Sequence, residues 1–280
     1  MADRGDARPI GVFDSGVGGL TVLAELRRRL PDESTLYLGD NARTPYGPRP
    51  ADDVRRFTLE ALDWLLEKDV KLLVLACNTA TARALPDVRD RATVPVVGVV
   101  RPGAVAAAAA TRSRAVGVIA TAGTVESGAY HDAIVDADPA IAVAQVACPE
   151  LVPMVEAGIM DGRRAESVLR AYLDPLVASH SAMDTLLLGC THYPLLRSPI
   201  QAIVGSDVSV VDSAFTTALA VEDLLDALGS RAPIGAAAGH RVTTTGDVGA
   251  FVTVAQRLFG ERLPDVESVA IEARAAVPVD

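Results

Sequence analysis

Two cysteines stand at matching places in this chain, and their type and surroundings suit acid–base or nucleophilic chemistry. Cys77 and Cys190 each follow a short apolar run, and each is followed by small hydrogen-bonding residues, Asn-Thr and Thr-His respectively. A thiol at the end of a strand and just before a helix is expected to have its pKa lowered from the free value of about 8.5. We therefore predict two reactive thiols. The third cysteine, Cys148 in Val-Ala-Cys-Pro, is expected to be an inert buried residue.

Two thiols on opposite walls of one pocket suit proton transfer at a carbon atom. One thiolate removes a proton from one face of the carbon, and the other thiol delivers a proton to the opposite face. Each group must lie within hydrogen-bond reach of the carbon that it serves. The product is the mirror image of the substrate, and the two thiols exchange roles in the reverse reaction.

Other uses of the cysteines fit the sequence less well. A zinc site is disfavoured because the chain has no C-x-x-C and only four scattered histidines. A redox pair lacks the usual close spacing. A pyridoxal mechanism needs a lysine, but Lys68 and Lys71 both precede the strand that leads to Cys77, at the wrong end for the site. A cysteine hydrolase with His192 as its base stays open, although it gives the second cysteine no role. We expect no metal and no cofactor.

The elements that position the cysteines follow an alternating pattern. Short Val- and Leu-rich runs are typical of buried parallel strands, and amphipathic stretches between them predict helices. Strand and helix in alternation indicate an α/β fold with parallel sheets. The predicted strands cover 10–13, 35–38, 72–76, 94–100, 116–119, 185–188 and 208–211, and the clearest helices cover 20–30, 51–67, 103–111 and 163–179.

The chain also resembles itself. Residues 10–15 align with 116–121, 72–79 with 185–192 and 94–98 with 208–212, at offsets of 106, 113 and 114 residues. This order predicts two pseudo-symmetric domains, each a mostly parallel sheet flanked by helices, with the active site in the cleft between them. We place residues 1–101 and 212–280 in the first domain, with Cys77, and residues 102–211 in the second, with Cys190.

Composition excludes several function classes. The chain has 280 residues, 50% of them hydrophobic, with a net charge of −10 and a pI of about 4.9. Such an acidic chain has no general attraction to nucleic acids or anionic membranes. We find neither a bilayer-length apolar stretch nor a signal-peptide pattern, and three widely spaced cysteines make no disulfide framework. We therefore expect a cytoplasmic protein.

Polar clusters follow several of the other predicted strands. In Asp-Ser-Gly-Val-Gly-Gly, residues 14–19, the glycines are expected to let the chain pass close to a ligand, and Asp14 to bind an ammonium group or tune a thiol. The loop 40–47 lies at the same sheet edge and is predicted to bind the ligand, although a simple turn is the alternative. For Thr121 and Thr124 the alternative is helix capping. Composition alone places Glu156 in solvent, and residues 243–247 receive no site role.

Five motifs together resemble those of glutamate racemases, in the aspartate/glutamate racemase family. They run in order through the chain as FDSGVGGLTV (13–22), DNARTPYG (40–47), ACNTA (76–80), VPMVEAG (152–158) and LGCTHYPLL (188–196). The resemblance implies a two-domain racemase that needs no cofactor, with Cys77 and Cys190 as the acid–base groups. Asp14 would assist Cys77, and Glu156 and His192 would assist Cys190. The implied substrate-binding residues are Asp14, Ser15, Pro45, Tyr46, Gly47, Asn78, Thr79, Thr121, Thr191 and His192.

The resemblance also carries expectations about substrate and partners. It implies D-glutamate made for peptidoglycan, and a homodimer. An aspartate or hydantoin racemase is the alternative, but similar aspartate enzymes tend to carry an acidic residue where this chain has His192. Some relatives are reported to contact DNA gyrase, and nothing in this sequence supports such a role.

Overall fold

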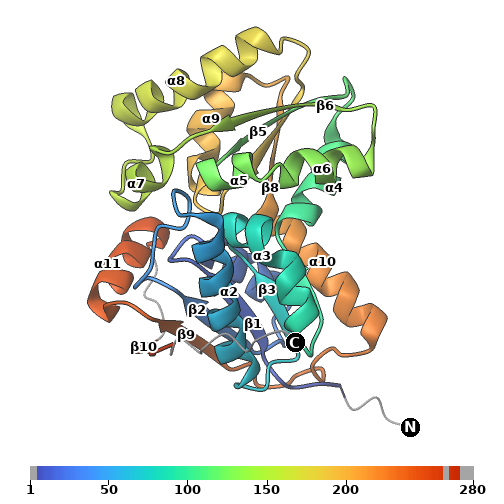
Figure 1. Cartoon of the computed structure of the whole chain (residues 1–280), viewed down its shortest axis with the longest axis vertical. Coiled ribbons are helices and arrows are strands. Elements are labelled where there is room, and N and C mark those ends of the chain that lie inside the picture. The colour runs from blue at the N-terminus through green and yellow to red at the C-terminus, as the bar shows by residue number, and fades with distance from the viewer. Residues whose placement is uncertain (1–4, 261–264, 272–280) are drawn as a thin grey trace.

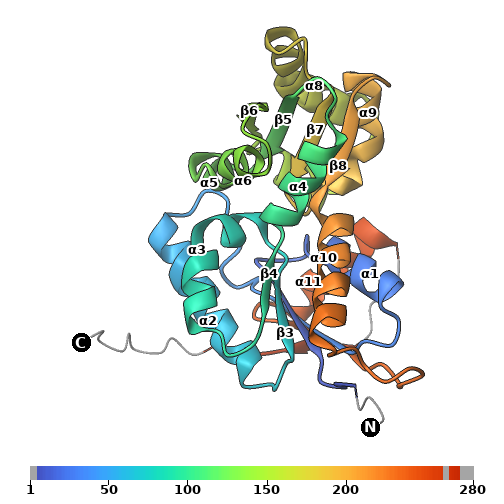
Figure 2. The same ribbon diagram turned by 90° about the vertical axis from the view of Figure 1, so that its right-hand side faces the viewer.

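Two parallel β-sheets, each covered by helices on both faces, make up the protein (Figures 1 and 2). The computed structural model describes residues 5–260 and 265–271. Every strand pairing is parallel, so the carboxyl ends of the strands in each sheet lie at one edge. The predicted α/β class is confirmed.

The first sheet has six strands in the order β10-β9-β2-β1-β3-β4. Helices α1 and α10 pack together on one face, and α2 and α3 pack together on the other (Figure 2). The strands are β1 (Ile10–Asp14), β2 (Thr35–Gly39), β3 (Leu72–Leu75), β4 (Val96–Gly98), β9 (His240–Thr244) and β10 (Val266–Ser268). The helices are α1 (Leu20–Arg29), α2 (Ala51–Leu66), α3 (Asn78–Arg91), α10 (Ser213–Leu228) and α11 (Val248–Phe259).

The second sheet has four strands in the order β6-β5-β7-β8. Helices α4 and α6 pack together, as do α8 and α9 on the other face (Figure 2). The strands are β5 (Ala115–Ala120), β6 (Ala142–Ala147), β7 (Thr185–Gly189) and β8 (Ser209–Asp212). The helices are α4 (Val100–Ala110), α5 (Ala122–Glu126), α6 (Ala129–Ala137), α7 (Leu151–Glu156), α8 (Gly162–Ser179), the 3₁₀ helix η1 (Tyr193–Leu196) and α9 (Arg197–Val204).

The strand orders confirm the internal repeat. The order β2-β1-β3-β4 in the first sheet matches β6-β5-β7-β8 in the second, strand for strand. Cys77 follows β3 and Cys190 follows β7, which are equivalent strands. The two cysteines therefore occupy the same place in two similar halves, as the alignment of their flanking residues predicts.

Two of the sequence-based boundaries are wrong. The predicted strand over 94–100 is only Val96–Gly98, because Val99 already has helical backbone angles and begins the turn into α4. Helix α4 thus starts at Val100 and not at 103. Strand β6 went unpredicted because Gln145 interrupts its apolar run and the strand is only partly buried.

The chain passes between the two halves twice, from β4 into α4 and from β8 into α10 (Figure 2). Direct hydrogen bonds also join the halves near the strand ends. Thr21 Oγ1 donates to the carbonyl of Thr191 at 3.0 Å, and the N–H of Gly123 donates to the carbonyl of Gly47 at 3.0 Å. The division into domains at residues 101 and 212 stays a prediction. Within the described residues, none of the helices combines the length and apolar character needed to span a bilayer.

Candidate active site

One pocket of about 160 Å³ contains both Cys77 and Cys190. Its walls come from the segments that follow three strands of each sheet, β1, β2 and β3 on one side and β5, β6 and β7 on the other. Ligands of α/β proteins bind at such carboxyl ends. The predicted binding residues that line the pocket are Ser15, Pro45, Tyr46, Gly47, Asn78, Thr79, Thr121, Thr191 and His192.

Cys77 is the N-cap residue of α3 and is buried, with 5% of its surface exposed. Its Sγ accepts the N–H of Ala80 at 3.4 Å and donates to Ser15 Oγ at 3.5 Å. Burial, with the negative charge of Asp14 adding to it, raises the pKa of the Cys77 thiol to about 12 despite these hydrogen bonds. The prediction of a lowered pKa is therefore wrong for Cys77, since burial outweighs the effect of the helix end.

Asp14 does not line the pocket but lies buried close to Cys77, at the end of β1. Its Oδ2 accepts the N–H of Gly16 at 2.8 Å. Burial raises the pKa of the Asp14 carboxyl, although the backbone N–H groups of Gly16 and Gly19 and the charge of His192 oppose the shift. A carboxyl with a raised pKa beside a thiol is suited to exchange a proton with it.

Cys190 has a different partner. Its Sγ lies 3.9 Å from His192 Nδ1, and His192 Nε2 lies 3.0 Å from Glu156 Oε1. Burial alone would lower the pKa of His192, but the contacts with Cys190 and Glu156 raise it to about 10. The imidazole is therefore protonated at neutral pH, and it lies beside the sulfur of Cys190 as a positively charged partner.

Glu156 corrects the expectation drawn from composition. Its side chain is only 33% exposed and pairs with His192 instead of lying free in solvent. It ends α7, and Arg257 on α11 donates to its carbonyl oxygen at 2.8 Å, so the first half of the molecule helps to hold it. The resemblance to a family pointed to this residue, whereas its local sequence gave no signal.

The glycines after β1 make room for side chains of the site. A β-carbon at Gly18 would lie 2.5 Å from both His192 Nδ1 and Thr191 Oγ1, and one at Gly19 would lie 2.5 Å from the β-carbon of Asp14. The sequence predicts that a ligand approaches these glycines. In the structure the side chains of Asp14, Thr191 and His192 approach them instead.

The loop after β2 closes the pocket between the halves. Tyr46 donates to Asp40 Oδ2 at 2.5 Å, and the Thr44–Pro45 peptide bond is cis. Across the pocket, Thr121 Oγ1 lies 2.9 Å from Thr79 Oγ1. Thr121 also caps α5, so the capping interpretation and the position in the pocket hold together.

Sequence reasoning missed one wall of the pocket, made of Cys148, Pro149, Val152 and Pro153. These residues follow β6, the strand that its apolar pattern does not reveal. Burial raises the pKa of the Cys148 thiol to about 12, with Cys190 adding to the shift, so this thiol stays protonated. That state agrees with the expected inert character of Cys148, although its position in the pocket was not expected.

Neither lysine lies near the pocket. Lys71 is buried at the amino end of β3, where its Nζ lies 2.6 Å from Glu33 Oε2, and Lys68 lies over the ring of Trp64. Among the described residues, no group of three or more His, Cys, Asp or Glu side chains is arranged to hold a metal ion.

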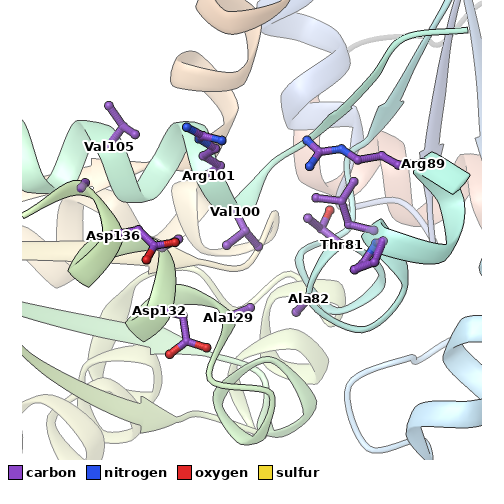
Figure 3. Close-up of a pocket in the computed structure, with 13 residues that line it drawn as sticks. Thr81, Ala82, Arg89, Val100, Arg101, Val105, Ala129, Asp132 and Asp136 are labelled. Carbon is purple, nitrogen blue, oxygen red and sulfur yellow. The ribbon is translucent and has the colours of Figure 1, made fainter.

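A second pocket, of about 350 Å³, lies between α3, α4 and α6 (Figure 3). It shares no lining residue with the first pocket and has no cysteine. Its charged side chains, Arg89, Arg101, Asp132 and Asp136, are all exposed.

Known proteins are similar to this chain in sequence and in fold. The family model described as Asp/Glu/Hydantoin racemase matches residues 18–222. A glutamate racemase of Oceanobacillus iheyensis is 48% identical over 254 residues, covering 91% of this chain and 92% of that protein.

Solved structures agree. Glutamate racemase RacE1 from Bacillus anthracis superposes with a TM-score of 0.90 at 41% identity, covering 94% of this chain and 98% of that one. The enzyme from Francisella tularensis in complex with D-glutamate gives a TM-score of 0.89 at 32% identity, covering 96% of this chain and 100% of that one. The chain thus belongs to the Asp/Glu/hydantoin racemase family.

Proposed function

We propose that this enzyme is a glutamate racemase that interconverts L- and D-glutamate by proton transfer between two cysteines, without a cofactor. The observation that carries the proposal is one small pocket in which two of the three buried thiols, Cys77 and Cys190, each lie beside an acid–base partner. The similarity to glutamate racemases over more than nine tenths of the chain supports glutamate as the substrate. His192, in place of an acidic residue, favours glutamate over aspartate.

The pocket offers groups for each part of an amino acid. The hydroxyls of Thr79 and Thr191 and the amide of Asn78 are hydrogen-bond donors for carboxylate oxygens. The carboxyl of Asp14 lies buried close to Cys77 and would stabilise the α-ammonium group. Bringing that positive charge into the pocket would favour the thiolate form of Cys77, against the effect of burial.

The two cysteines have different surroundings. Burial raises the pKa of Cys77, so this thiol holds its proton, and His192 lies beside Cys190. One cysteine, as a thiolate, takes the α-proton, the electron pair stays on the α-carbon, and the opposite thiol then gives its proton to the other face. One C–H bond breaks and one forms, so the substrate is inverted and the protons balance.

The proposal also includes the domain division, the location, the oligomeric state and the use of the product that the sequence leads us to expect. Residues 1–101 with 212–280 form one domain and residues 102–211 the other, with the pocket between them. The enzyme acts in the cytoplasm, as a homodimer, and supplies D-glutamate for peptidoglycan.

The first test is circular dichroism of the purified protein with L-glutamate and then L-aspartate, in heavy water with no added cofactor. Loss of optical activity with glutamate, together with deuterium at the α-carbon, is the expected result. Activity on aspartate alone would make the protein an aspartate racemase. If neither amino acid loses its optical activity, the hydrolase alternative is favoured.

Single-cysteine variants test the assignment of two bases. Cys77→Ala and Cys190→Ala should each lose racemisation, because one face of the carbon has lost its proton carrier. Each variant should retain at most exchange of the α-proton with solvent, for one enantiomer only, and the two variants should act on opposite enantiomers. Near-normal turnover in either variant contradicts the two-base mechanism.

A further inference from the structure

Tyr130 on α6 contacts the segments that carry both cysteines, although it does not line the pocket. The side chain is completely buried, and its hydroxyl lies 2.5 Å from Asn78 Oδ1, in the residue after Cys77. Its ring packs against Gly189, the residue before Cys190. A β-carbon at Gly189 would lie only 2.9 Å from ring atom Cε2.

The hydrogen bond between the Tyr130 hydroxyl and Asn78 has a defined direction. Ser213 and the Tyr130 oxygen both lie next to Gly103. A β-carbon added at Gly103 would be 3.4 Å from the Ser213 β-carbon and 3.5 Å from the Tyr130 oxygen. Burial raises the pKa of Tyr130, so the phenol keeps its proton, and the nearby Ser213 side chain lowers that pKa by a smaller amount. The proton of Tyr130 is then directed to Asn78, whose amide oxygen accepts it.

With its oxygen held in this way, the amide of Asn78 presents its nitrogen as the free end. Within residues 5–260 and 265–271, Asn78 Nδ2 is buried and has no hydrogen-bond partner. Asn78 lines the pocket, and a buried N–H group without an acceptor is costly. A carboxylate of a bound amino acid supplies the missing acceptor.

We propose that Tyr130 is a positioning residue that orients the Asn78 amide so that its N–H bonds meet a carboxylate of the substrate. The proposal rests on the racemase activity proposed above. It differs from a role in packing alone because the ring of Tyr130 is enough to fill the space beside Gly189, whereas only the hydroxyl can hold the amide oxygen.

The test is Tyr130→Phe, which keeps the ring and removes the hydroxyl. Racemisation of glutamate is followed by circular dichroism in both directions, and thermal unfolding is recorded alongside. We expect kcat/KM to fall about tenfold, mainly through a higher KM, because the Asn78 amide binds substrate and transition state alike. The matched control is Tyr172→Phe, which loses one hydrogen bond, to Glu150 Oε1 at 3.0 Å, outside the pocket lining. It should leave KM within twofold of the wild-type value.

A double-mutant cycle separates positioning from packing. If Tyr130 acts through Asn78, then Tyr130→Phe in an Asn78→Ala background should change KM by less than a further twofold. Independent effects that multiply would overturn the proposal, as would an unchanged KM in Tyr130→Phe. If Tyr130→Phe does not fold, Ser213→Ala keeps the tyrosine and changes the surroundings of its oxygen. It should raise KM about threefold, and no change there would equally overturn the proposal.

The wild-type reaction separates this proposal from the one on which it rests. Wild-type protein that leaves both enantiomers of glutamate unchanged overturns the proposed function and the positioning role together. Active wild-type protein with an unaffected Tyr130→Phe variant overturns the positioning role alone.

Discussion

Gly18 is the position where one added carbon atom should damage the site most specifically. In Gly18→Ala the new β-carbon would lie 2.5 Å from Cε1 and Nδ1 of His192 and from Thr191 Oγ1. Ordinary contacts between such atoms are about 3.5 Å, so the imidazole has to shift by about 1 Å. The backbone at Gly18 has no positive φ, so alanine brings no conformational strain of its own.

The expected cost falls on catalysis more than on stability. His192 Nδ1 now lies 3.9 Å from Cys190 Sγ, and a displacement of about 1 Å at a catalytic group typically costs about 10²-fold in rate. Overpacking of this size costs about 1–3 kcal/mol in the free energy of unfolding. We therefore expect kcat/KM for glutamate to fall about 100-fold in a variant that remains folded at 25 °C.

The assay is the circular-dichroism progress curve in both directions, with thermal unfolding to check the fold. Gly239→Ala is the matched control. Its β-carbon would meet only Ser34 Oγ, at 3.9 Å, and neither Gly239 nor Ser34 lines the pocket. In a His192→Ala background, Gly18→Ala should cost less, because only the contact with Thr191 Oγ1 remains. A folded Gly18→Ala variant within threefold of wild-type kcat/KM would show that the added carbon does not displace the imidazole of His192.

Three further predictions concern the groups that assist the cysteines. Asp14→Asn removes the charge that helps to raise the pKa of Cys77, so the pH profile of Cys77 alkylation should move to lower pH while kcat for glutamate falls about 10²-fold. Glu156→Gln removes a charge that raises the pKa of His192, so the imidazole should titrate at lower pH by NMR and kcat should fall about tenfold. Because the pKa of His192 rises from 6.5 to about 10 on folding, its stabilisation is complete below about pH 6.5 and is lost as pH rises through 10. The gap in urea-unfolding free energy between wild type and His192→Gln should therefore be wide at pH 6 and narrow by pH 10, and a constant gap would contradict the assignment.

The sequence predicts most of the pocket for a simple physical reason. Parallel strands place their carboxyl ends at one edge, so polar residues after β1, β2, β3, β5 and β7 have to meet there. Glu156 cannot be found in this way, because it lies on α7 and reaches His192 across 36 residues of chain through packing alone. Tyr130 is equally hidden, since a tyrosine on an apolar helix face usually means core. The raised pKa of Cys77 depends on burial by distant segments, which no local pattern contains.

The surroundings of the two cysteines are less symmetric than the cysteines themselves. Cys77 lies beside a buried carboxyl from its own sheet, whereas Cys190 lies beside a protonated imidazole held by Glu156. The two walls of the pocket therefore offer a substrate different acid–base partners, a carboxyl beside one thiol and an imidazole beside the other.

The exchange of roles between the two thiols has a consequence for turnover. After each inversion the thiolate has become a thiol and the thiol a thiolate, so the enzyme must either run the reverse reaction or move a proton back. Asp14 and His192 each lie beside one of the sulfurs, and the pKa of each is raised from its ordinary value. They are therefore placed to exchange protons with the two cysteines between turnovers. On this reasoning, replacing either partner should slow the return of the free enzyme as well as the chemical step, and it should do so unequally for L- and D-glutamate.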